Sequence, residues 1–147
     1  MLWSSNDVTQ QGSRPKAKLG LLMFAIRVLP ATERDVDGQR LGEITISEFT
    51  ERFACYPGGA GADELDRVWR AELRKLVDGA TAVALAHDPR FAWVIYREGQ
   101  SCFVQQVFSP DGDFRDHLAS HTVVTEDGHR VSEWNTDVSA IAEFLGA

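Results

Sequence analysis

The most constraining feature of this chain is a pair of aromatic and β-branched segments on either side of a short link. The segments FAWVIY (Phe91–Tyr96) and SCFVQQVF (Ser101–Phe108) flank residues 97–100, which contain a glycine. This pattern is typical of a β-hairpin. Because a short turn can join only antiparallel neighbours, the pattern excludes an all-helical chain and favours an antiparallel sheet.

Other segments predict further strands. Apolar alternation or short apolar runs between turn residues indicate strands at Phe24–Leu29 and at Thr81–Ala86. Residues 42–53 begin with strand-like alternation, and their second part could continue as a strand or become helical; a strand is the favoured interpretation. His121–Thr125 and His129–Trp134 surround the turn sequence Glu-Asp-Gly at 126–128, which indicates a second hairpin.

Two segments predict amphipathic helices. The first runs from Asp63, a candidate N-cap, to Asp78, and Gly79 ends it. Its apolar residues recur at helical spacing, at Leu65, Trp69, Leu73 and Leu76. A second helix follows Thr136 or Asp137 as its cap, with one apolar face formed by Val138, Ile141, Phe144 and Leu145.

The order of these elements predicts an α+β fold, with a mostly antiparallel sheet and two α-helices packed on one face. A length of 147 residues fits one domain. Residues 1–20 are polar and aperiodic, which predicts a disordered N-terminal extension. We therefore expect a single domain over residues 21–147.

Charge and composition narrow the class of partner. Asp and Glu number 22 against 15 Lys and Arg, a net charge of −7. A surface of this sign disfavours direct binding to nucleic acid. No apolar run has membrane-spanning length, and Leu21–Leu29 lacks a signal-peptide cleavage site. With two cysteines and no disulfide framework, we expect a cytoplasmic protein that contacts no membrane.

Few residues suggest a reaction. His117 and His121 lie four residues apart beside Asp116, but no zinc-protease pattern follows, so exposed loop histidines are the better interpretation. Cys55 and Cys102 lack a nucleophile signature, and a buried thiol is the better interpretation of Cys102. We expect no catalytic residue, metal or cofactor, although a small enzyme using these cysteines or histidines stays an alternative.

Acidic side chains gather in two places. Asp111, Asp113 and Asp116 fall in one loop, and Glu126 and Asp127 fall in one turn. The loop lacks the length and the closing glutamate of a calcium site. Either these carboxylates are simply solvated, or they form part of a surface that meets a cationic partner. The sequence leaves both interpretations open.

Several segments in this order give the chain a family resemblance. They are LGEITISEF at Leu41–Phe49, VWRAELRKLVDG at Val68–Gly79, YREG with FVQQ at residues 96–106, and EDGHRVSEW at Glu126–Trp134 with the final helix. Together they resemble the immunity proteins of bacterial contact-dependent growth inhibition, of the CdiI type.

The resemblance implies a small cytoplasmic protein that binds the C-terminal domain of its cognate toxin and covers the active or substrate-binding site. By analogy with the class, that toxin is expected to be a nuclease. Because toxin-contacting residues vary in such systems, the resemblance assigns none, and the five acidic residues above are our candidates. A ligand-binding or scaffolding α+β module with no toxin partner is the remaining alternative.

Overall fold

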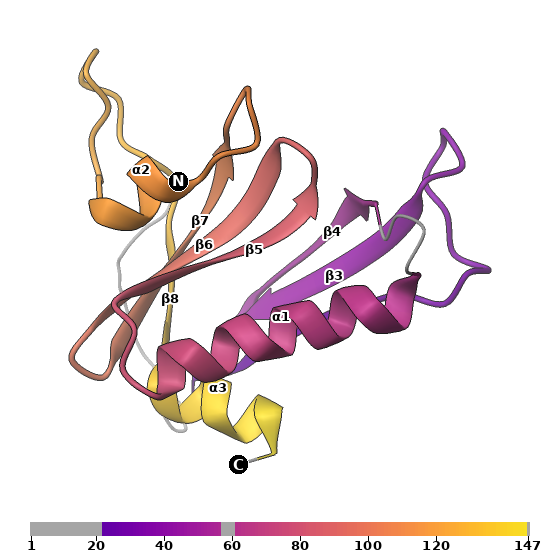
Figure 1. Ribbon diagram of the computed structural model, residues 1–147, viewed down its shortest axis with the longest axis horizontal. Helices are drawn as coiled ribbons and strands as arrows, with labels where there is room; N and C mark the ends of the chain where they lie inside the picture. The colour runs from indigo at the N-terminus through magenta and orange to yellow at the C-terminus, as the bar shows by residue number, and fades with distance from the viewer. Residues whose placement is uncertain (1–21, 57–60, 147) are drawn as a thin grey trace.

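The strands form two antiparallel sheets in the computed structural model, which describes residues 22–56 and 61–146 (Figure 1). The first sheet has the order β2 (Phe24–Val28), β3 (Arg40–Ile46) and β4 (Phe49–Cys55). The second has the order β5 (Ala82–Asp88), β6 (Phe91–Glu98), β7 (Ser101–Phe108) and β8 (Trp134–Asp137). The hairpin predicted at residues 91–108 is β6–β7, with Glu98 paired to Ser101.

In the part of the chain that the structure describes, three helices accompany the sheets. The helices α1 (Ala62–Val77) and α3 (Val138–Leu145) pack against each other and against the sheets. The short helix α2 (Arg115–Ala119) lies against the opposite face of the second sheet (Figure 1). The predicted α+β class with antiparallel strands is confirmed, although the strands divide between two sheets and α2 adds a helix that sequence periodicity did not reveal.

The main hydrophobic core lies between α1, α3 and the two sheets. The predicted apolar face of α1 contributes three buried side chains to this core, Trp69, Leu73 and Leu76. The indole nitrogen of Trp69 donates a hydrogen bond to the carbonyl of Ala86 on β5 at 2.8 Å. The helix is therefore fixed to the second sheet by a polar contact as well as by apolar packing.

The two helix caps differ from each other. Asp137 caps α3 as predicted, since its carboxylate accepts from the backbone N–H of Ala140 at 2.8 Å. The predicted cap of α1 is wrong. Gly61 occupies the N-cap, with φ of 87°, and Asp63 lies inside the first turn with no capping bond. The carboxylate of Asp63 there favours the helix only through its charge near the positive end of the dipole.

Polar contacts also join the two sheets. The backbone N–H of Tyr56, just after β4, donates to the carbonyl of His87 on β5 at 2.8 Å. At the other end, the hydroxyl of Ser47 donates to the carbonyl of Asn135 on β8 at 2.9 Å. The sheets are thus held together at two separate places.

The predicted disordered extension, residues 1–20, lies outside the described residues, so it stays a prediction, as does the single domain over 21–147. Among the three helices described, none is long and apolar enough to cross a membrane.

Candidate functional site

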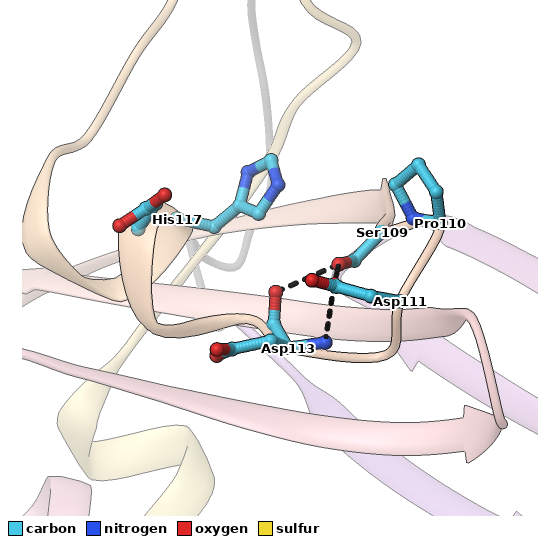
Figure 2. Close-up of a pocket in the computed structure, with 6 residues that line it drawn as sticks. Ser109, Pro110, Asp111, Asp113 and His117 are labelled. Atoms are coloured by element: carbon cyan, nitrogen blue, oxygen red, sulfur yellow. Dashed lines mark hydrogen bonds between the residues drawn. The ribbon is translucent and has the colours of Figure 1, made fainter.

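The acidic loop after β7 is folded by its own side chains. The hydroxyl of Ser109 lies 2.9 Å from a carboxylate oxygen of Asp111 and 2.7 Å from the carbonyl of Asp113 (Figure 2). The same carboxylate of Asp111 accepts from the backbone N–H of Asp113 at 3.0 Å. These contacts, first that N–H and then the Ser109 hydroxyl, lower the pKa of Asp111. The loop therefore holds the Asp111 carboxylate ionised and in a fixed position.

A pocket of about 410 Å³ opens over this loop and α2, and it brings the first predicted acidic group together. It is lined by Ser109, Pro110, Asp111, Asp113, Asp116 and His117. Hydrogen bonds from the Arg115 side chain, 2.6 Å away at the shortest, lower the pKa of Asp113 to about 2. Within residues 22–56 and 61–146, no group of three or more His, Cys, Asp or Glu could hold a metal ion.

The second predicted acidic group lies on a separate element, residues 120–133, which we call the arm. Glu126 and Asp127 lie at its tip, beyond the bridge that pairs Val124 with Arg130. The arm extends past α2 and away from the sheets (Figure 1). The predicted hairpin is correct in its turn, but its flanks form one isolated bridge in place of regular strands, and β8 begins only at Trp134.

The structure thus separates the five candidate residues into two groups. Asp111, Asp113 and Asp116 line the pocket, whereas Glu126 and Asp127 do not. Both groups belong to the continuous segment from Ser109 to Glu133, which carries six Asp and Glu against two Arg, a net of −4 out of the chain's −7. More than half of the net charge therefore lies in this one segment.

The structure encloses His87 and half-buries His121, whereas the sequence predicted His121 to be an exposed loop histidine. His87 is 4% exposed, and its Nδ1 lies 3.0 Å from the carbonyl of Ala54. With that nitrogen protonated, its Nε2 accepts from the amide of Gln106 at 3.2 Å. The ring is enclosed because β4 and β5 meet there. This long-range contact gives no local sequence signal.

The ring of His121 lies between two carboxylates. Its Nδ1 is 2.7 Å from an oxygen of Glu98 on β6, and its Nε2 contacts Glu133 at the base of the arm. The ring also stacks on Tyr96, with centroids 4.5 Å apart and planes 16° apart. Burial disfavours its charged form, but the hydrogen bonds to Glu133 and Glu98 outweigh burial and raise the pKa of His121.

The cysteines are buried, which agrees with the interpretation of Cys102 as a structural thiol. Burial raises the pKa of Cys55, and it raises the pKa of Cys102 to about 11. A nucleophilic cysteine needs a lowered pKa, because the thiolate is the reactive species. Neither thiol has the electrostatic environment of a catalytic residue.

Comparison with known proteins identifies the family. The sequence model of the CdiI N-terminal domain matches residues 61–144, which is more than half of the chain. The chain belongs to this family. The match runs from the start of α1 to α3 and contains both the pocket and the arm. The resemblance to CdiI proteins predicted from the sequence is confirmed.

The similarity between this chain and individual CdiI proteins extends over different lengths. The immunity protein CdiI of Enterobacter cloacae subsp. cloacae is 29% identical over 93 residues, which cover 52% of this chain and 63% of that protein. The chain thus spans less than two thirds of this curated relative. A solved structure of the CdiA-CT/CdiI toxin and immunity complex from Enterobacter cloacae contains a chain with the same fold, at a TM-score of 0.65 and 23% identity. That likeness covers 84% of this chain and 97% of the other.

Proposed function

We propose that this protein is an immunity protein, which binds the C-terminal toxin domain of a contact-dependent growth inhibition system and neutralises it. The observation that carries the proposal is the match of the CdiI N-terminal domain over residues 61–144. Support also comes from the relative named as an immunity protein and from the similar fold in a toxin and immunity complex.

The proposed mode of action is occupation of the toxin's active or substrate-binding site. A nuclease needs a basic surface to hold its nucleic acid substrate, since phosphate contacts dominate such binding. A chain of net charge −7 is complementary to a basic surface of that kind. We infer that the toxin is a nuclease and that this protein competes with the nucleic acid for the same surface.

Neutralisation of this kind requires no chemistry from the immunity protein. The raised pKa values of both buried thiols argue against the alternative of a cysteine enzyme. His117 and His121 do not share a helix as zinc ligands would, because α2 ends at Ala119. We therefore propose a protein that is not an enzyme, needs no cofactor and acts in the cytoplasm, where an incoming toxin meets its target.

The proposed contact residues are the two acidic groups of the segment 109–133. Asp111, Asp113 and Asp116 present carboxylates around the pocket, and Glu126 and Asp127 present them at the arm tip. Carboxylates at the rim of an interface accelerate association with a basic partner, and those at its centre pair with its Lys or Arg side chains.

Co-expression tests the proposal. The toxin domain encoded beside this gene should stop growth when produced alone, and this protein should restore growth and co-purify with it. A toxin domain of different sequence, from another such system, is the matched control and should still kill the cells. Failure to protect against the neighbouring toxin, with both proteins present at normal levels, would contradict the proposal.

A further inference from the structure

The arm adds little to the fold, which raises the question of what it is for. Residues 122–130 are all exposed. Among the described residues, neither hydrophobic core includes a buried side chain of the arm. Val123 and Val124 remain 40% and 43% exposed. An element that contributes so little apolar burial is not explained by stability.

The arm is nevertheless held in one conformation by its own hydrogen bonds. The backbone N–H of Thr125 donates to the carbonyl of His129 at 2.8 Å, and that of Val131 donates to Val123 at 2.9 Å. The carboxylate of Asp127 accepts from the hydroxyl of Thr125, which lowers the pKa of Asp127. The tip is therefore an ordered turn, with the Asp127 carboxylate hydrogen-bonded within it.

The base of the arm is fixed to the second sheet by a buried amide. Gln105 on β7 is 3% exposed. Its side-chain nitrogen donates to the carbonyl of Thr122 at 2.9 Å and to a carboxylate oxygen of Glu133 at 2.9 Å. Both N–H bonds of this amide are thus directed to the arm, one to each of its flanks.

The ring of His121 also holds the base of the arm in place. A neutral imidazole has one N–H, so it can donate to only one of the two carboxylates that it contacts. The geometry with Glu98 and Glu133 is satisfied in full only by the doubly protonated ring, which donates to both. Tyr96 stacks on this ring, and its hydroxyl donates to the carbonyl of His117 on α2 at 2.8 Å.

We propose that the arm is the element that docks onto the basic surface of the partner protein, and that His121 is the positioning residue that holds it in its docking orientation. This inference rests on the proposed function and specifies which element makes the contact. A rigid arm loses little conformational entropy on binding, so its order favours affinity. The arm itself carries Glu126, Asp127 and Glu133 against Arg130, a net of −2, which favours a cationic protein over nucleic acid or a second copy of this acidic chain.

Proton binding gives the arm a dependence on pH. The titratable groups that face His121 are Glu98 and Tyr96 from β6 and Glu133 from the arm, while Gln105 and Phe103 of β7 are neutral. As pH rises through the raised pKa of His121, the ring loses one proton and one of its two carboxylate contacts. The arm is then held less firmly, so affinity for the partner should fall.

Calorimetric titration of the full chain with the toxin domain encoded beside its gene tests the arm. The double variant Glu126→Lys/Asp127→Asn should weaken binding about tenfold or more, since it alters charges at the contact. The control Asp37→Lys/Glu48→Gln makes the same change in net charge at exposed positions in the turns between the strands of the first sheet, and should change affinity less than about threefold. Equal weakening by both variants, or no weakening by the first, overturns the inference.

A second titration between pH 6 and pH 9 tests His121. His121→Gln keeps a hydrogen-bonding side chain but cannot carry the charge. We expect it to weaken binding about fivefold at pH 6 and to match the unaltered chain at pH 9. A ratio of the two dissociation constants that does not change with pH overturns the role of His121. If the unaltered chain does not bind the toxin domain, the proposed function fails; if it binds and the arm variants bind equally well, only this inference fails.

Discussion

The rings of Phe49 in the first sheet and Trp134 in the second stack with centroids 4.2 Å apart and planes 18° apart. Trp134 also contacts the fully buried Trp93 edge-on, at 6.1 Å. The two sheets are therefore joined by a line of aromatic rings that runs from β4 through β8 to β6.

Removal of the ring at Trp134 should weaken this aromatic contact between the two sheets. We expect Trp134→Ala to lower the free energy of unfolding by about 2–3 kcal/mol, less than the cost for a fully buried ring because Trp134 is half-buried. Trp134→Phe keeps a stacking ring and should lose clearly less. Urea unfolding followed by circular dichroism measures both changes. A loss below about 1 kcal/mol for the alanine variant would show that the stack contributes little.

Arg97 should stabilise the end of α1. Its guanidinium donates to the carbonyls of Leu76 at 2.8 Å and Val77 at 3.0 Å, which are among the last carbonyls of the helix. The Leu76 carbonyl also accepts from the backbone N–H of Gly79 at 3.1 Å. The Nε of Arg97 donates to Gly99 in the hairpin turn at 2.9 Å. Lysine cannot make this fork of bonds, so Arg97→Lys should cost about 1–2 kcal/mol. Amide exchange in the last turn of α1 should become faster, and unchanged exchange would refute the capping role.

Two histidines, the buried His87 and the half-buried His121, should give the free energy of unfolding opposite dependences on pH. Burial lowers the pKa of His87, so the unfolded chain takes up a proton near pH 6.5 before the folded chain does. The stability associated with neutral His87 is therefore full above that pH and falls as pH drops toward the folded pKa. The pKa of His121 is raised, so its contribution is full below about 6.5 and falls as pH rises through the folded pKa.

Unfolding by urea across pH 4–9 would separate these effects. With His121→Gln, the free energy of unfolding should no longer fall as pH rises above about 6.5. Its fall at acid pH should be unchanged. With His87→Gln, the free energy of unfolding should fall less as pH drops, because the variant removes the group that must stay neutral in the folded protein. Nuclear magnetic resonance titration of the two rings would measure both pKa values directly, and we expect that of His121 to be the higher. A higher pKa for His87 than for His121 would contradict this account.

Both thiols should be inert in the folded protein. The chain has two cysteines, both buried, and their raised pKa values leave almost no thiolate at neutral pH. The test uses an aromatic disulfide reagent that releases a coloured product when it reacts with a cysteine thiol. It should react with neither cysteine in buffer and with both in denaturant. Rapid reaction of one thiol in the native protein would revive the alternative of a cysteine-dependent enzyme.

Local patterns were sufficient to predict much of the fold. The stripe Trp69, Leu73 and Leu76 predicted α1, and the segments around Gly99 predicted the β6–β7 hairpin, because neighbouring residues determine both elements. The division into two sheets was not predictable in this way. It depends on contacts between distant residues, such as Ser47 with Asn135.

The candidate site was predictable only in part. The acidic sequence located the pocket loop and the arm tip, since turn residues and carboxylates occur together there. The roles of His87 and His121 were not predictable, because their partners Ala54 and Glu98 lie 33 and 23 residues away in the chain.

The most direct test of the central claim joins binding with inhibition in one titration. The purified toxin domain encoded beside this gene is mixed with increasing amounts of this protein, while complex formation and nucleic acid cleavage are both followed. The account predicts a tight complex at micromolar concentration or below, with activity lost in proportion to the complex formed. No association at micromolar concentration, or a complex in which the toxin stays fully active, would contradict it.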